Sequence, residues 1–167
     1  MILGCDPGVT GALAAYDEVS ATLLSVIDMP IKMRRVNGTD RRRLDAVGVQ
    51  DWLIGHRGLG ARRFIIEKVS GLPGQSAPAA FNFGFGFGTI ISCARMLGYE
   101  VQFVTPQEWK GKMVRTTRES KIKQASLNKA KLLFPASAEA FKRKMDHGRA
   151  EAALIARYGA DFTEWGN

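Results

Sequence analysis

The feature that most constrains the fold is a pair of short apolar runs that each end in a single acid. The run ILGCD ends at Asp6, and the run RFIIE ends at Glu67. Apolar runs of this length, followed by Gly and Pro or by a loop, are typical of strands buried in a sheet. A carboxylate at the end of a buried strand needs a partner, because an unpaired buried charge is costly. We therefore expect a sheet that carries functional acids at two strand ends.

Each of these acids also has an ordinary structural role to consider. Asp6 precedes the turn PGVTG and could cap that turn through backbone amides. Lys68 follows Glu67 directly, but adjacent strand residues point to opposite faces, so Lys68 is badly placed to neutralise it. We interpret Glu67 as a functional carboxylate. For Asp6 taken alone, a functional role and a role in capping the turn are both possible interpretations.

A third acidic group precedes the last apolar run of the chain. The stretch KMDHGRAEAALIARYG brings Asp146, His147 and Glu151 within six positions. His147 and Glu151 stand four residues apart, about 40° around a helix, whereas Asp146 can join them only from the preceding turn. Asp146 could instead be a helix N-cap, and His147 an ordinary partly exposed residue. Taken with the two strand-end acids, this cluster predicts the oxygen-rich shell that Mg²⁺ prefers and that serves phosphodiester hydrolysis.

The remaining pattern predicts one α/β domain that covers residues 1–167. We expect a hairpin over 1–17, strands over 21–30, 31–37, 62–69 and 100–106, and helices over 44–54, 79–99, 106–113, 119–134 and 147–159. Alternation of strands with helices in the second half indicates parallel crossovers. The predicted fold is therefore a mixed sheet, with three antiparallel strands followed by parallel strands, flanked by helices.

Charge and composition narrow the partners. The chain has 24 Lys and Arg against 16 Asp and Glu, a net charge of +8, which favours nucleic acid over a charge that serves solubility alone. Cys5 and Cys93 lie in apolar segments, without a spacing typical of zinc or of a disulfide framework. We see no run near the roughly 20 apolar residues of a membrane span and no secretion signal at the start, so we expect a cytoplasmic protein.

Five segments together resemble a known family. In chain order these are ILGCDPGVTGA, FIIEKV, VTPQEWK, the helix from Lys123 to Pro135, and DHGRAEAALIARYG. The sequence resembles the RuvC-type Holliday junction resolvases of phages and prophages, within the RNase H-like superfamily. This resemblance implies an RNase H-like sheet and metal-dependent cleavage of four-way and other branched DNA. It also implies Mg²⁺ as the cofactor, with two ions per active site and Mn²⁺ as a substitute, and the cytoplasm of a bacterial host if a phage encodes the chain.

The resemblance also implies roles for individual residues. Asp6, Glu67 and Glu151 match the acids of the family. The fourth ligand would be Asp146, with His147 as a co-ligand or proton handler. Lys110 and Lys123 resemble basic residues near the scissile phosphate, where their charge would neutralise phosphate. Gln75 and Arg149 are further candidates for DNA binding. The loop GLPGQSAP and the start of AAFNFGFGFG, within residues 71–88, resemble the segment that enters the junction centre.

A homodimer is expected for such an enzyme. A four-way junction has two-fold symmetry, and paired cuts require two equivalent sites. The apolar helix from Phe81 to Met96 has more hydrophobic faces than one small core should need, so it is the candidate interface.

Three alternatives remain. The first is another RNase H-like nuclease, either a ribonuclease H or a general branched-DNA nuclease, with the same carboxylates. The second is an actin-like phosphotransferase, suggested by DPGVTG but disfavoured because no second phosphate loop is found and such proteins are much longer. The third is a DNA-binding module without catalysis, which metal titration would test.

Overall fold

The main sheet has five strands in the order β3-β2-β1-β6-β7. The computed structural model describes residues 1–36, 38–69, 74–114 and 119–166, with the backbone alone for 119–122. The strands of the main sheet are β1 (Ile2–Asp6), β2 (Ala12–Asp17), β3 (Thr22–Asp28), β6 (Arg63–Glu67) and β7 (Glu100–Val104). β1, β2 and β3 pair antiparallel, while β1, β6 and β7 pair parallel. The predicted mixed sheet is confirmed.

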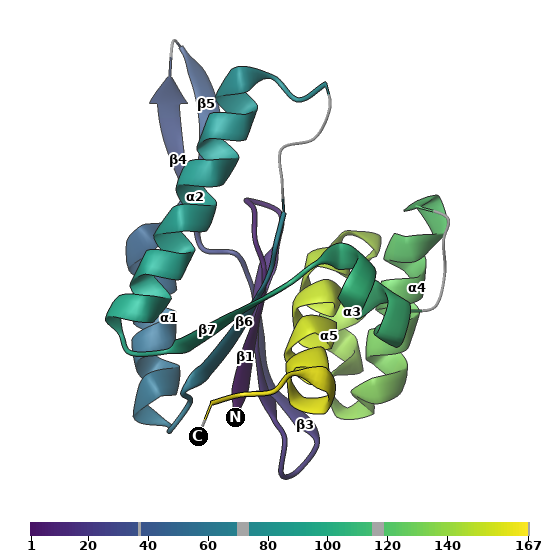
Figure 1. The fold of residues 1–167 in the computed structure, drawn as a ribbon. Coiled ribbons are helices and arrows are strands. Elements are labelled where there is room, and N and C mark those ends of the chain that lie inside the picture. The colour runs from purple at the N-terminus through teal and green to yellow at the C-terminus, as the bar shows by residue number, and fades with distance from the viewer. Residues whose placement is uncertain (37, 70–73, 115–118, 167) are drawn as a thin grey trace.

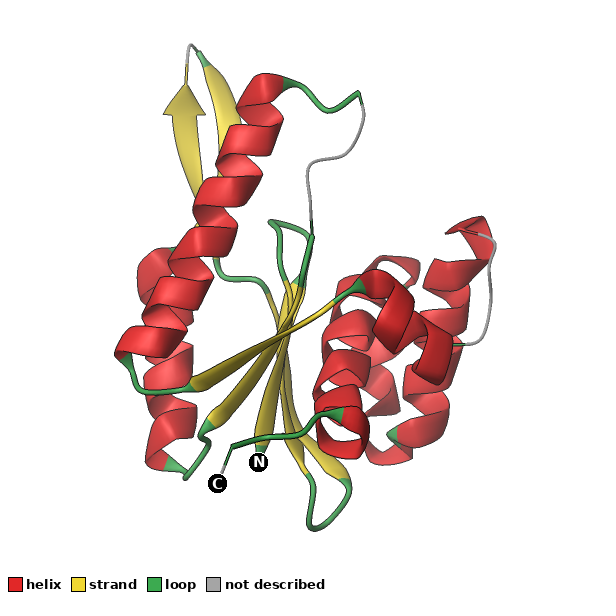
Figure 2. Cartoon of the chain, in the orientation of Figure 1, coloured by secondary structure: helices red, strands yellow, loops and turns green. Residues whose placement is uncertain are grey.

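Helices cover both faces of this sheet (Figure 1, Figure 2). One face carries α1 (Ala46–Gly58) and α2 (Ala77–Met96), and the other carries α3 (Pro106–Met113), α4 (Glu119–Leu133) and α5 (His147–Phe162). Two 3₁₀ helices, η1 (Pro135–Phe141) and η2 (Lys144–Asp146), connect α4 to α5. The sheet is therefore buried between two helical layers, which explains why its central strands are apolar throughout.

Small residues bring α5 unusually close to the central strand. A Cβ added to Gly4 of β1 would lie 2.4 Å from the carbonyl oxygen of Ala152 and 2.5 Å from the backbone nitrogen of Ala156. All five residues from Ala152 to Ala156 are fully buried. Close packing of this helix places the acids of α5 within reach of the strand ends.

One predicted strand pairs elsewhere. Residues 31–36 do form a strand, β4 (Ile31–Val36), but it pairs only with β5 (Thr39–Leu44) in a separate two-stranded sheet. The predicted strand also included residue 37, which lies outside the described residues. Pro30 separates β4 from β3, and β4 is exposed along its whole length, so it has no apolar face to bury in the main sheet. In Figure 1 this hairpin stands beyond the end of the main sheet, beside α2.

Helix α2 is more exposed than its composition suggests. It is long and apolar enough to cross a membrane by those two measures alone, with a mean hydropathy of 1.2 over an 18-residue window. The expectation that no segment reaches this length and hydropathy was therefore wrong. A single helix of this kind is weak evidence for a membrane span, because helices of soluble proteins meet the same measures. Phe81, Phe85 and Met96 are each at least 70 % exposed, so α2 presents an uncovered apolar surface.

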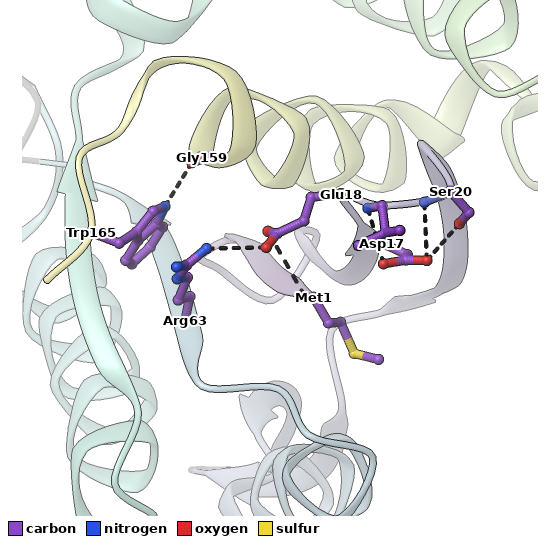
Figure 3. A network of polar contacts seen from close by, with 8 residues as sticks. Met1, Asp17, Glu18, Ser20, Arg63, Gly159 and Trp165 are labelled. Atoms are coloured by element: carbon purple, nitrogen blue, oxygen red, sulfur yellow. Dashed lines mark hydrogen bonds and ion pairs between the residues drawn. The ribbon is translucent and has the colours of Figure 1, made fainter. Parts of the chain in front are cut away.

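Polar contacts tie together the edge of the sheet where β1 begins (Figure 3). The carboxylate of Glu18 accepts from Arg63 at 3.1 Å and lies 3.8 Å from the amino group of Met1. The indole of Trp165 donates to the carbonyl of Gly159 at 2.7 Å, which anchors the end of the chain against α5. These paired groups occupy one end of the sheet, and the acids Asp6 and Glu67 lie at the other end.

Candidate active site

Three carboxylates meet at the carboxyl ends of β1 and β6. Asp6 ends β1, Glu67 ends β6, and Glu151 lies in the second turn of α5. One oxygen from each lies within 4.8 Å of the others. Asp6 is partly exposed, while Glu67 and Glu151 are buried, with exposed fractions of 5 % and 8 %. The sequence prediction that acids from distant segments meet is confirmed for these three.

Glu67 is held by two neighbours from α3. The indole nitrogen of Trp109 donates to its Oε1 at 2.9 Å, and Lys110 Nζ lies 3.9 Å from the same oxygen. Helix α3 begins directly after β7 with a capping box between Thr105 and Glu108, which fixes where the helix starts. Because β7 lies next to β6, this start brings the buried Trp109 and the half-buried Lys110 over Glu67.

Glu151 is positioned by the close contact between α5 and the turn after β1. A Cβ added to Gly148 would lie 2.6 Å from the carbonyl oxygen of Thr10, so only glycine allows this approach. The oxygens of Glu151 then lie 3.5 Å from Lys110 Nζ and 3.4 Å from the buried hydroxyl of Ser126, which donates from α4. Elements from four parts of the chain thus converge on the carboxylates.

The pKa values of Asp6 and Glu67 reflect their burial and the short distances between the carboxylates. Burial raises the pKa of Asp6 well above its ordinary range, and the nearby charges of Glu151 and Glu67 raise it further. Burial also raises the pKa of Glu67, although Trp109 and Lys110 act in the opposite direction. Burial is the largest cause of both shifts, and like charges at short range add to it. The cluster carries more negative charge than its neighbours offset.

These residues fit a hard divalent cation. All three donors are carboxylate oxygens, which Mg²⁺ and Mn²⁺ prefer, and the cluster holds neither cysteine nor histidine of the kind typical of zinc sites. Lys110 is the only cation within 4.0 Å of the three carboxylates among the described residues. A divalent cation would relieve the mutual repulsion that raises the pKa of Asp6.

The two predicted lysines take different positions. Lys110 forms ion pairs with both Glu67 and Glu151, as described above. Lys123 is exposed on α4 and forms no ion pair with a described residue, yet its charge is near enough to lower the pKa of Asp6. Both lysines therefore lie at the site, one in direct contact with it and one at longer range.

Asp146 and His147 do not join the cluster in this structure. Asp146 is buried, and its oxygens accept from the backbone nitrogen of Arg143 at 2.8 Å and from its guanidinium at 2.9 and 2.7 Å. Burial acts to raise the pKa of Asp146, but the bonds from Arg143 outweigh it, so the pKa lies below its ordinary value. Arg143 therefore occupies the carboxylate oxygens through which Asp146 was predicted to bind a metal as the fourth ligand. His147 begins α5, half-buried, one turn before Glu151 on the same side of the helix, and its role stays a prediction.

The two further DNA-binding candidates are Arg149, which is paired with an acid, and Gln75, which lines a cavity. The guanidinium of Arg149 donates to both oxygens of Asp28 at 2.6 Å, so its charge is already paired. Gln75 lines a cavity between β5 and α2. DNA binding by either residue stays a prediction.

Sequence reasoning missed several residues that position the site. Trp109 and Ser126 hold the two buried glutamates, and Arg143 and Asp28 hold the residues around the start of α5. The position of Trp109 directly before Lys110 was the available signal, because a helix that begins at a strand end places its first turns over the neighbouring strand. The partner of Asp146 was also close by, three residues earlier in the chain.

Comparison with known proteins adds a fold but no sequence relative. No protein-family model matches the chain, and no curated protein sequence matches it. Among solved structures, the chain is similar to Thermus thermophilus RuvC in complex with a Holliday junction substrate, with a TM-score of 0.59 and 14 % identity over 95 % of this chain and 93 % of that chain. A second Thermus thermophilus RuvC structure gives a TM-score of 0.56 and 13 % identity over 95 % and 94 % of the two chains. The protein therefore has the fold of the RuvC resolvases along nearly its whole length.

Proposed function

We propose that this protein is a structure-selective endodeoxyribonuclease that cuts four-way and other branched DNA junctions by divalent-metal-dependent hydrolysis. The observation that carries the proposal is the meeting of Asp6, Glu67 and Glu151 within 4.8 Å at the strand ends of a RuvC fold. One of the similar RuvC structures contains a Holliday junction substrate, and this supports branched DNA as the substrate class. The net charge of +8 favours the same partner.

The three carboxylates are the residues that would hold the metal. Bound Mg²⁺, or Mn²⁺ in its place, would supply an activated water and stabilise the leaving oxygen of the phosphodiester, and we propose two ions. The chain itself holds the acids in a fixed arrangement, because Trp109 and Ser126 bond to Glu67 and Glu151 from separate helices. His147 and Asp146 are the candidates for a further ligand.

Two lysines of the chain would act on the phosphate. Lys110 lies 3.5 Å from Glu151 and is held against the ring of Trp109, so it has little freedom to leave the site. A cation held at this position neutralises charge that develops on the phosphate during the reaction. Lys123, which is exposed on α4, would contact the same strand of DNA further from the carboxylates.

A homodimer through α2 completes the proposal. The exposed side chains of Phe81, Phe85 and Met96 leave an apolar surface along α2 that a second copy would cover. Two copies related by a two-fold axis would present two sites to the symmetric junction. Sedimentation at micromolar concentration tests this, and a monomer that still makes paired cuts would contradict it. The cytoplasm is the proposed place of action, in a bacterial host if the chain is phage-encoded.

Cleavage of a substrate panel tests the function. Labelled four-way junction, linear duplex and RNA–DNA hybrid are incubated with the protein and Mg²⁺, in parallel with the variants Glu67→Gln and Glu139→Gln. Glu139 is an exposed glutamate paired with Lys142, away from the three carboxylates, so it controls for the loss of one acid. We expect cuts in the junction alone, lost in Glu67→Gln and kept in Glu139→Gln.

Other outcomes would favour other functions. Preferred cleavage of the RNA strand in the hybrid would indicate a ribonuclease H, and cleavage of all branched and linear DNA would indicate a general nuclease. Binding of junction DNA without cleavage in either Mg²⁺ or Mn²⁺ would indicate a binding module. An actin-like phosphotransferase has no support from the similar structures.

A further inference from the structure

The β4–β5 hairpin carries a high density of positive charge, which does not stabilise the hairpin itself. Residues 31–44 contain six basic residues and one acid, so this short segment supplies five of the eight net positive charges of the chain. The pairing register sets Lys32 opposite Arg43 and Arg34 opposite Arg41. Like charges directly opposite each other destabilise a sheet. Charge that opposes folding in this way points to a partner with negative charge.

The described part of the chain leaves most of this charge unpaired. Lys32 forms an ion pair with Asp45 at 2.8 Å. Arg34, Arg41 and Arg43 form no ion pair with any residue that the structure describes. Arg41 and Arg43 stand two residues apart in β5, so their side chains lie on the same face of the hairpin.

Arg41 and Arg43, together with Arg42 between them, line a cavity of about 700 Å³ between β5 and the N-terminal half of α2. The opposite wall contains Asn82, Phe83 and Phe87, and the rings of the two phenylalanines are nearly parallel, with centroids 6.3 Å apart. Ser76, the N-cap of α2, also lines the cavity, so the positive end of the helix dipole points toward it. The cavity therefore combines arginines, a helix N-terminus and an aromatic wall.

The cavity adjoins the proposed active site. Gly8 and Val9, which line it, follow Asp6 by two and three residues. A Cβ added to Gly8 would lie 3.6 Å from the ring of Phe83, so this ring borders the turn that carries the carboxylate. The hairpin is at the same edge of the sheet, because β3 runs parallel to β1 and the register aligns its last residue, Asp28, with Asp6 through Ala12.

We propose that this cavity binds an unpaired, single-stranded segment of DNA next to the cleaved phosphate. Phosphates would contact Arg41 and Arg43, and a base or sugar would pack against Phe83. Grooves for single strands combine basic residues with aromatic side chains in this way. A sphere of this volume is about 11 Å across, which is room for one strand, whereas a duplex consists of two strands separated by grooves of about 6 and 12 Å. The occupant is therefore a single strand. This proposal deepens the proposed function, and it rests on that function for the identity of the substrate as DNA.

Binding without cleavage tests the proposal. Fluorescently labelled single-stranded and duplex oligonucleotides of equal length are titrated with protein in Ca²⁺, at several salt concentrations. The variant Arg41→Gln/Arg43→Gln removes two of the three arginines that line the cavity and keeps Arg42. The matched control, Arg34→Gln/Arg35→Gln, removes the same charge from β4, where neither residue lines the cavity. A third variant, Phe83→Leu, removes the ring but keeps an apolar side chain.

The cavity variant should lose at least about tenfold in single-strand affinity, and the slope of log K against log salt should fall by about 1.4, since each phosphate contact on a single strand contributes about 0.7. The control should lose less than about threefold. Phe83→Leu should lose about fivefold or more with an unchanged slope, because stacking is not ionic. Thermal melting confirms that each variant is folded, and removal of Arg41 should not lower the melting temperature, since it relieves repulsion with Arg34.

Equal losses in the cavity variant and the control would overturn the proposal, because the charge of the hairpin would then act without regard to the cavity. Absence of single-strand binding by the unaltered protein would overturn it as well. Neither result affects the nuclease proposal if the protein still cuts junctions. Conversely, strand binding that depends on Arg41 and Arg43 would stand even if no junction were cut.

Discussion

Replacing Asp6 with Asn should stabilise the metal-free protein while abolishing cleavage. In the structure the oxygens of Asp6, Glu67 and Glu151 lie within 4.8 Å of each other. Two unit charges at that separation repel by about 3 kcal/mol at an effective dielectric constant of about 20. Lys110 and partial protonation relieve part of this repulsion, so we expect Asp6→Asn to raise the free energy of unfolding by about 1–2 kcal/mol.

The sign of the pH dependence follows from the raised pKa values of Asp6 and Glu67. In the unfolded chain these groups titrate near their ordinary values of about 4. Between those values and the raised folded values, the folded protein binds more protons than the unfolded chain. The contribution of these groups to stability is therefore greatest at low pH and is lost as pH rises through the folded pKa values. The advantage of Asp6→Asn should grow over the same range.

Thermal melting in EDTA measures this effect. For a domain of this size, 1 kcal/mol shifts the melting temperature by about 2–4 °C, so Asp6→Asn should melt about 2–8 °C above the unaltered protein at pH 8. The difference should shrink toward pH 4. Millimolar Mg²⁺ should raise the melting temperature of the unaltered protein and leave that of the variant nearly unchanged. A variant that melts lower than the unaltered protein at pH 8 without metal would refute the reasoning, since it would give Asp6 a stabilising structural role.

Three further predictions concern other parts of the site. Lys110→Gln should reduce junction cleavage by about 10²–10³-fold with junction binding nearly unchanged, because one fixed cation near the phosphate is lost; equal loss of binding and cleavage would instead make it a general DNA contact. Gly4→Ala should destabilise the fold by at least about 1–3 kcal/mol in denaturant unfolding, because its Cβ would lie 2.4 Å from the backbone of α5; an unchanged midpoint would mean that α5 is not held this closely. Asp146→Asn should lower the melting temperature without changing Mg²⁺ affinity, since the oxygens of Asp146 bond to Arg143. His147→Ala should weaken Mg²⁺ binding. The opposite pattern of Mg²⁺ affinities in calorimetric titration would make Asp146 the ligand.

The sequence was most informative where a buried strand ends in an acid. ILGCD and RFIIE predicted both the strands and the edge at which Asp6 and Glu67 meet, because parallel strands bring their carboxyl ends together. Glu151 was predictable from its place in the last helix. The order of the main sheet, with antiparallel strands before parallel ones, also followed from the alternation of elements.

Local patterns could not reveal features that depend on tertiary pairing. The segment TDRRRL has no apolar alternation, so β5 was not predicted, and β4 was assigned to the wrong sheet. Asp146 was expected as a metal ligand and Arg149 as a DNA contact, but each forms an ion pair, with Arg143 and Asp28 respectively. The partner of Arg149 lies 121 residues away in the chain, so no local signal could indicate it.

The most direct test of the central claim is a map of the cuts in an immobile four-way junction, made with the protein in Mg²⁺ and with Glu151→Gln beside it. The three-carboxylate site predicts cuts in two opposite strands at symmetric positions near the crossover, absent in EDTA and absent in Glu151→Gln, while that variant still binds the junction. Cuts that persist in Glu151→Gln, or a folded protein that binds the junction and leaves it whole in both Mg²⁺ and Mn²⁺, would contradict the claim that these carboxylates form a metal-dependent nuclease site.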